Sequence, residues 1–310
     1  MAKSRPLALV TGGSNGIGLE LAREFANNGY DLVLAAENED HLADAARELS
    51  AGGGRVDTYA ADLSREDAVE GLCRSLDGRP VDALCVNAGV GLGGRFVETD
   101  LQRELKMIDL NVRGAVQLTK LVAKNMVERG AGKILFTSSI AATMPDPFEA
   151  VYGSTKVFLR WFGEALREEL KGTGVTVTVL MPSMTETNFF HRAGMMDTKA
   201  GVAKKDDAAV VAKAGYDALM AGRDKAIPTF KNKVMAAIAD TLPDTWAAKG
   251  HRGLSEPGSA GKKSNAATIA AGVAAAGVGI ALFASWKGRQ DKAADLPKRR
   301  SAINEGGRSN

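Results

Sequence analysis

The sequence predicts an α/β fold: a doubly wound parallel sheet in a single domain, followed by a C-terminal helical or disordered extension. Short β-type apolar runs alternate with amphipathic helical segments as far as residue 241. This alternation is typical of a parallel sheet covered by helices on both faces. The first run, residues 7–10, also leads directly into a glycine-rich turn, 11–18, and then into an amphipathic helix that ends near Gly29.

Six further runs supply the other strands, and the segments between them have the periodicity of helices. The predicted strands are residues 31–36, 55–60, 83–86, 133–136, 175–180 and 226–228. The predicted helices are residues 39–51, 100–129, 150–171 and 206–221, with one more at 232–241. Asn111 lies near the middle of the helix 100–129, where asparagine is intrinsically unfavourable, so its side chain is either exposed or held by a specific contact.

Composition excludes several classes of function. The net charge of +3 is too small to favour nucleic acid as a partner. Cys73 and Cys85 are the only cysteines, and the apolar run around Cys85 predicts a buried, unpaired thiol. Unpaired cysteines and the lack of a signal-peptide pattern indicate the cytoplasm. His41, His191 and His251 are scattered along the chain, so we expect surface positions for them and no metal site.

The glycine-rich turn after the first strand has the pattern of a phosphate-binding turn. Gly12 permits a tight turn, Gly16 lets the backbone approach a pyrophosphate, and Gly18 lets the helix pack closely on the strand. The alternative is a loop that merely contains glycines. The position of the turn directly after a first strand favours binding.

Polar residues at the ends of the next strands extend this prediction. Glu37 follows the second strand at the spacing where an acid accepts from the 2′-hydroxyl of an adenosine ribose and repels a 2′-phosphate, which favours NAD. The alternative is an ordinary acid at a helix start. Asp62 ends the third strand, where a side chain can reach an adenine amino group. The turn Asn87-Ala88-Gly89 after the fourth strand would let a cofactor lie against the backbone.

A tyrosine and a lysine share one face of the helix that starts near Ala150. Tyr152 and Lys156 are four residues apart, so their side chains project from the same side. A tyrosine that moves protons near neutral pH needs its pKa lowered from about 10, and a nearby ammonium group is one way to lower it. The alternative is a surface pair one turn apart.

These features together resemble the short-chain dehydrogenase/reductase family, whose catalytic domain is a Rossmann fold. The resemblance covers residues 6–241. It rests on the glycine turn 11–18, Asp62, Asn87-Ala88-Gly89, Asn111, Ser139 and the pair Tyr152 and Lys156, in the family's order and spacing.

The resemblance implies an NAD(P)-dependent oxidoreductase that interconverts a secondary alcohol and a ketone. Tyr152 would be the general acid/base, and Lys156 would hold the nicotinamide ribose and lower the pKa of the tyrosine. Ser139 would bind and orient the substrate carbonyl, and Asn111 would support a proton relay through water to Lys156. The implied cofactor-binding residues are Gly12, Ser14, Asn15, Gly16, Ile17, Gly18, Glu37, Asp62, Asn87, Ala88, Gly89, Tyr152, Lys156, Pro182 and Thr187.

Two positions depart from the family pattern. Ser183 follows Pro182 where the family usually has glycine, although Thr187 stands where the family uses threonine to contact the carboxamide. Glu37 lies one place beyond the family's usual acidic position, at Ala36. NADP-preferring members place a basic residue at the positions of Asn15 or Glu37, so the sequence favours NAD and leaves NADP open.

Other functions remain alternatives at this stage. The first is a redox-sensing regulator that binds the cofactor on the same fold without turnover, and the second is a membrane-tethered structural protein. The sequence does not identify the substrate or the direction of the reaction. Residues 185–205 are expected to form most of the substrate pocket, and Phe189, Phe190, Met195 and Met196 suggest an apolar small molecule, unless they only pack a lid.

The sequence also predicts a homo-oligomer. The helices 100–129 and 150–171 lie where the resembled family builds a four-helix contact between subunits. One face of the second helix carries more apolar surface than a single sheet face would cover, through Val157, Phe158, Trp161, Phe162 and Ala165.

The family resemblance does not cover the C-terminal region. Residues 250–263 have the composition of a Gly/Ser-rich linker, and residues 264–286 are 23 uncharged residues rich in Ala and Gly. As a helix they would span about 34 Å, but few are large and apolar, so insertion into a bilayer is marginal. Residues 287–310 form a basic, disordered tail with seven basic and three acidic residues. We expect peripheral membrane attachment through residues 264–300, and the alternative is a loosely helical tail in solution.

Overall fold

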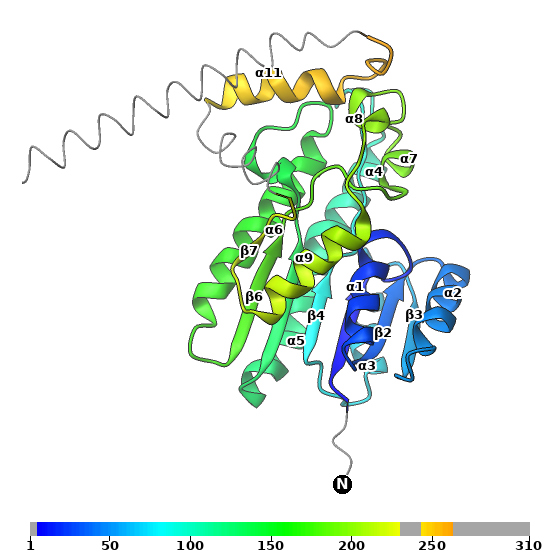
Figure 1. Cartoon of the computed structure of the whole chain (residues 1–310). Helices are drawn as coiled ribbons and strands as arrows, with labels where there is room; N and C mark the ends of the chain where they lie inside the picture. Colours follow the sequence, from blue (N-terminus) through cyan, green and yellow to red (C-terminus); the bar gives the residue numbers. More distant parts are fainter. Residues whose placement is uncertain (1–4, 230–242, 263–310) are drawn as a thin grey trace, which may run out of the picture. The chain divides into compact units, whose positions relative to one another are not determined.

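The computed structural model describes residues 5–229 and 243–262, and over these ranges it contains one parallel sheet of seven strands in the order β3-β2-β1-β4-β5-β6-β7 (Figure 1). The strands are β1 Leu7–Thr11, β2 Asp31–Ala36, β3 Val56–Ala60, β4 Ala83–Val86, β5 Gly132–Thr137, β6 Val175–Leu180 and β7 Lys225–Ala226. The order reverses between β1 and β4, so the prediction of a doubly wound α/β fold is confirmed.

The connections between the strands are helical. The α-helices are α1 Gly16–Asn27, α2 Glu39–Ser50, α3 Glu66–Ser75, α4 Leu101–Ile108, α5 Ala115–Arg129, α6 Ala150–Glu169, α7 Phe189–Arg192, α8 Lys199–Val202, α9 Ala208–Met220 and α11 Asp244–Ser255. Two short segments are η1, a π-helix at Asp109–Gly114, and η2, a 3₁₀-helix at Ile140–Thr143. Helix α3 was not among the predicted helices, because polar residues separate its few apolar ones.

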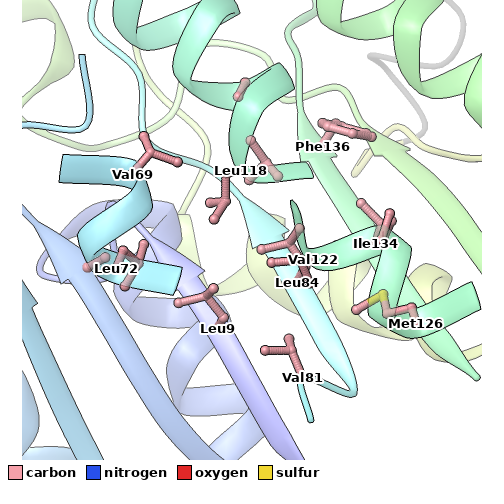
Figure 2. Close-up of a cluster of buried hydrophobic side chains, with 14 of the residues drawn as sticks. Leu9, Val69, Leu72, Val81, Leu84, Leu118, Val122, Met126, Ile134 and Phe136 are labelled. Carbon is pink, nitrogen blue, oxygen red and sulfur yellow. The ribbon is translucent and has the colours of Figure 1, made fainter. Parts of the chain in front are cut away.

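Two apolar layers hold the helices on the sheet. Alternate residues of a strand point to opposite faces, so Leu9 packs with α3, α5 and α6 whereas Val10 packs with α1, α2 and α9. Figure 2 shows the first layer, where Leu84 and Ile134 of the sheet face Val122 of α5. Both layers are needed because the strands of a parallel sheet are buried on both faces.

The predicted helix 100–129 is interrupted at the position of Asn111. Helix α4 ends at Ile108, η1 inserts one wide turn, and α5 continues to Arg129. Asn111 lies within η1 and is fully buried, so of the two alternatives for its side chain, exposed or held by a specific contact, the exposed one is excluded. Single π-turns inside helices are frequent at functional sites because they redirect a side chain without ending the helix.

The prediction of a linker at 250–263 is wrong over the described residues, which reach 262. Residues up to Ser255 complete α11, and Ser259 is buried and accepts a hydrogen bond at 3.0 Å from the backbone N–H of Lys199. The glycines of this segment lower helix propensity, but packing of Leu254 against the 184–200 region compensates.

The remaining expectations about the C-terminal region fall outside the described residues. They are the helix at 232–241, the uncharged segment 264–286 and the tail 287–310. Over the described ranges no helix is long and apolar enough to cross a membrane.

Candidate active site

Three hydroxyl and amide side chains connect the carboxyl ends of β1, β4 and β5. Thr11 Oγ1 accepts from the backbone N–H groups of Asn87 and Ala88, each at 3.0 Å, and donates to the carbonyl of Cys85 at 3.2 Å. Asn87 Nδ2 donates to the Thr11 carbonyl at 3.2 Å, and Thr137 Oγ1 donates to Asn87 Oδ1 at 3.0 Å. This network holds the predicted turn at Asn87 beside the glycine turn. Sequence reasoning missed Thr11 and Thr137, although a threonine that ends a buried strand is a visible signal.

The glycine turn has the shape that a dinucleotide pyrophosphate needs. Gly12 and Gly16 have positive φ angles of 65° and 56°, which favour glycine. A Cβ at Gly18 would overlap the carbonyl oxygen of Gly12, so the helix could not pack as closely with any other residue. Asn15 is the N-cap of α1, but its side chain accepts no hydrogen bond from the first turn of the helix. The first backbone N–H groups of α1 can therefore bind an anion.

The turn also meets the chain that follows β6. A Cβ at Gly16 would lie 2.8 Å from Cγ2 of Thr187, so Thr187 lies against the glycine turn. Pro182 accepts a hydrogen bond from the backbone N–H of Ile140 at 2.8 Å, which ties this segment to Ser139. The glycine turn therefore lies next to both Thr187 and Asn87, and its backbone amides and small residues fit a nicotinamide dinucleotide.

Lys156 is a buried cation at the same edge. Its Nζ donates to the Thr137 carbonyl at 3.0 Å and lies 5.7 Å from the ring centroid of Tyr152. Burial lowers the pKa of Lys156 to about 8. The predicted pair therefore forms on one face of α6, but as an enclosed pair and not as a surface one.

Asn111 stands beside this lysine. Its Nδ2 donates to the Val90 carbonyl at 2.9 Å and to Thr155 Oγ1 at 3.0 Å, and its Oδ1 accepts from the Val90 N–H at 3.0 Å. A Cβ at Gly89 would be 3.2 Å from both Asn111 Oδ1 and Lys156 Nζ, so Gly89 leaves room for both groups.

Tyr152 lies beside Ser139, close enough for Ser139 to influence the phenol. Burial of the phenol, followed by the negative charges of Glu149 and Asp146, raises the pKa of Tyr152, while the hydrogen bond with Ser139 lowers it. Ser139 is itself fixed as the N-cap of η2, where its Oγ accepts from the Ala141 N–H at 3.1 Å. The neutral phenol, which is a proton donor, is the favoured form in this setting.

The acidic residues expected to contact adenosine share a lysine that the sequence did not reveal. Lys106 of α4 lies 2.9 Å from Asp62 Oδ2 and 3.3 Å from Glu37 Oε1. Burial of Asp62 raises the pKa of its carboxyl, but hydrogen bonds from Lys106 and Ser64 outweigh this and keep the pKa below its usual value. Lys106 therefore neutralises part of the charge on which the NAD prediction depends.

The segment after β6 covers the tyrosine with aromatic side chains. The Phe189 ring lies 5.0 Å from that of Tyr152, and Phe190 and Met195 are buried in a cluster with Leu254 of α11. Met196, which the sequence also suggested for the pocket, is 48% exposed. The side chain of this segment that contacts Tyr152 is thus aromatic, while Phe190 and Met195 pack in the interior of the segment.

Replacing Lys156 by methionine is predicted to stabilise the fold at neutral pH. Because the folded-state pKa is below the ordinary value of 10.5, the cost of burying the ammonium is complete below pH 8 and is lost as pH rises towards 10.5. Lys156→Met should therefore raise the free energy of unfolding at pH 7 by up to about 3 kcal/mol. Loss of the hydrogen bond to the Thr137 carbonyl should reduce this gain by about 1 kcal/mol. The gain should shrink by pH 10.

Urea unfolding at pH 7 and pH 10 measures this gain. Lys171→Met, at a lysine whose side chain is 68% exposed, is the control and should show no such pH dependence. A Lys156→Met gain that is absent at pH 7, or equal at both pH values, would contradict the burial of a cation here.

Comparison with known proteins agrees with this geometry. The chain is 38% identical over 187 residues to sulfoacetaldehyde reductase 2 of Chromohalobacter salexigens, which covers 59% of this chain and 74% of that protein. It is 36% identical over 184 residues to a short chain dehydrogenase of Pseudocercospora fijiensis, which covers 58% of this chain and 60% of that protein, less than two thirds of its length.

A solved structure and a family profile extend the comparison. A short-chain dehydrogenase from Sphingobium yanoikuyae in complex with NADPH is similar with a TM-score of 0.69 and 26% identity, over 77% of this chain and 96% of that chain. The profile of the family described as short chain dehydrogenase matches residues 6–197, more than half of the sequence. The chain belongs to the short-chain dehydrogenase family of oxidoreductases.

Proposed function

We propose that the protein interconverts a secondary alcohol and a ketone by hydride transfer with a nicotinamide cofactor, and that Tyr152 is its general acid/base. The observation that carries this proposal is the juxtaposition of Ser139, Tyr152 and Lys156 with the glycine turn at one edge of the sheet. The NADPH in the Sphingobium yanoikuyae relative supports the cofactor class.

The chain's own residues orient the substrate and move the proton. When bound, the nicotinamide gives a hydride to the carbonyl carbon or takes one from the alcohol carbon. Ser139 and Tyr152 hydrogen-bond the substrate oxygen, and Tyr152 donates its proton to that oxygen in reduction and removes it in oxidation. Lys156 favours the phenolate that remains after donation, because its ammonium lies across the tyrosine ring.

Tyr152→Phe is predicted to lower turnover by about 10²-fold or more, since the proton donor is lost while the ring remains. A panel of ketones and secondary alcohols, followed by the absorbance of the reduced nicotinamide, first identifies a usable substrate. Tyr59→Phe, at a tyrosine on β3 outside the site, is the matched control and should keep wild-type rates. Equal rates for wild type and Tyr152→Phe would defeat the assignment, and cofactor binding without any turnover would favour a regulator.

We infer an apolar substrate from the side chains that cover Tyr152. Phe189 stands over its ring, and Phe190 and Met195 back Phe189 in one cluster. The panel should therefore show kcat/KM rising with the size of the apolar group on the ketone.

We also propose a preference for NAD over NADP, based on Glu37. Its side chain is 71% exposed at the end of β2, where it would repel a 2′-phosphate, while Lys106 at 3.3 Å reduces this repulsion. Glu37→Arg should shift the ratio of dissociation constants towards NADP by about tenfold or more, and Lys106→Met should shift it towards NAD.

Quenching or enhancement of NADH and NADPH fluorescence on binding measures both constants directly. Lys120→Met, at an exposed lysine on α5, is the control for loss of a positive charge. Tighter binding of NADPH than of NADH by the wild type would show that Glu37 does not govern the choice.

The protein is further proposed to be a homo-oligomer through α4 and α6. Leu101 and Leu105 of α4 are 63% and 45% exposed, and Phe158 and Trp161 of α6 are 39% and 59% exposed. Apolar surface of this kind on adjacent helices is typical of a subunit interface.

Static light scattering at micromolar concentration should give a multiple of the 32.5 kDa chain mass, and Trp161→Lys should lower it towards that mass. Trp246→Lys, at a tryptophan on α11 with 58% exposure, is the control and should leave the mass unchanged. A monomeric mass for the wild type would refute the proposal.

A further inference from the structure

The loop that precedes α6 contains two buried carboxyl groups that the mechanism above does not use. Asp146 and Glu149 are 7% and 6% exposed, and Glu149 is the residue directly before α6. Tyr152 follows in the first turn of that helix, so the two carboxyl groups and the phenol are close in the chain. Below, residues 146–149 are called the acidic loop.

Helix α11 holds the acidic loop through three contacts on one of its faces. His251 Nδ1 lies 2.8 Å from Asp146 Oδ1, and Ser255 Oγ donates to Glu149 Oε2 at 3.2 Å. The Arg252 guanidinium lies 5.3 Å from the ring centroid of Phe148. Residues 251, 252 and 255 are spaced as neighbours on a helix, so α11 meets the loop as one surface.

The acidic loop has a conformation that needs such support. Phe148 has a φ of 68°, in the left-handed region that is unfavourable for a bulky side chain. Conformations of this kind persist when surrounding contacts determine them, and they concentrate at functional sites. The backbone N–H of Gly94 also bonds the Phe148 carbonyl at 2.8 Å, and Arg95 lies over the same ring at 5.9 Å.

His251 is the compensating charge for Asp146. Apart from this ion pair, the described residues offer neither carboxylate oxygen of Asp146 a hydrogen-bond donor. The side chains of Asp146 and His251 are 2% and 17% exposed, so water screens the pair little. The expectation that His251 is an ordinary surface residue is therefore wrong, because the packing of α11 was not visible in the sequence.

We propose that His251 of α11 is a positioning residue for proton transfer: it compensates the buried acidic loop beside Tyr152 and so sets the pH range in which Tyr152 exchanges its proton. This inference rests on the proposed role of Tyr152. It adds α11, which lies beyond the part of the chain that the family profile matches, to the residues that govern the reaction.

The charges around Tyr152 give the direction of the effect. Glu149 and Asp146 disfavour the phenolate, whereas His251, once protonated, offsets them. Burial lowers the pKa of His251, but the contact with Asp146 and the charge of Glu149 outweigh this and raise the pKa above its ordinary value. The Lys156 ammonium lies 5.7 Å from the centroid of the Tyr152 ring, and the Arg95 and Arg252 guanidinium groups lie over the ring of Phe148.

Burial and the charge of Asp146 raise the pKa of Glu149 to about 8. The carboxyl of Glu149 therefore gains its negative charge at a higher pH than an ordinary glutamate, beside the contact between Asp146 and His251. Loss of the positive charge at His251 makes deprotonation of Tyr152 harder, and loss of the carboxyl charge at Glu149 makes it easier.

Proton NMR titration of the imidazole groups tests the ion pair without a substrate. In the holoenzyme, His251 should titrate at a higher pH than the exposed His41 and His191, and Asp146→Asn should bring His251 to or below them. Signals are assigned with His41→Gln, His191→Gln and His251→Gln. A His251 signal that titrates with the exposed histidines in the wild type, or is unmoved by Asp146→Asn, would overturn the proposal.

The pH dependence of kcat for oxidation of the best alcohol substrate tests the link to Tyr152. His251→Gln should move the rising limb to higher pH and Glu149→Gln to lower pH, each by about half a unit or more. Asp146→Asn/His251→Gln removes both charges of the ion pair and should return the limb towards the wild-type position. His41→Gln is the matched control and should leave the profile unchanged.

The outcomes separate a charge effect from a packing effect. If α11 only supports the fold, Asp146→Asn/His251→Gln should be slower than either single variant, and the rising limb of the pH profile should stay in place in all of them. That result would contradict the proposal. If Tyr152→Phe is inactive but the His251→Gln and Glu149→Gln variants leave the rising limb of the pH profile in place, the role of His251 is refuted and that of Tyr152 stands. A fully active Tyr152→Phe would remove the proposed role of Tyr152 and this inference with it.

Discussion

A buried ammonium group at the carboxyl edge of the sheet constrains much of what surrounds it. Lys156 is 5% exposed, and the hydrogen bond described for its Nζ goes to the carbonyl that ends β5. Burial of such a group costs stability, so its retention at this position indicates a role other than stabilising the fold. The absence of a side chain at Gly89 and the π-turn that directs Asn111 inward both belong to this arrangement. Lys156 thus links the helix that carries Tyr152 to the strand edge where the glycine turn begins.

Tyr152 therefore lies between opposing charges, with a cation on one side and a buried acidic loop on the other. The cation favours the phenolate and the two carboxyl groups disfavour it, so the proton affinity of the phenol depends on a balance. Helix α11 contributes to this balance from outside the sheet through His251. Distant parts of the chain can then adjust the chemistry without any change in the Ser139, Tyr152 and Lys156 set.

Local patterns and long-range contacts differed in how far the sequence revealed them. The bounds of β2, β4 and β6 were predicted correctly, because apolar runs ending in turn residues carry a strong local signal. The unfavourable place of Asn111 in a helix marked it for attention, but the sequence left open whether its side chain is exposed or held by a contact. By contrast, Lys106 and Glu37 are 69 residues apart, and Ser255 and Glu149 are 106 apart. Such long-range contacts depend on how helices pack, which periodicity does not encode.

Direct binding of reduced nicotinamide cofactors is the measurement that bears most closely on this site. Titration of NADH and NADPH against the full chain should show saturable binding of at least one of them. Gly18→Ala should weaken it by about tenfold or more, because its Cβ would meet the Gly12 carbonyl and open the turn. Gly53→Ala, at a glycine in a surface turn, serves as the comparison for general destabilisation. Failure of both cofactors to bind the wild type, or equal binding by Gly18→Ala, would contradict a dinucleotide site at this edge of the sheet.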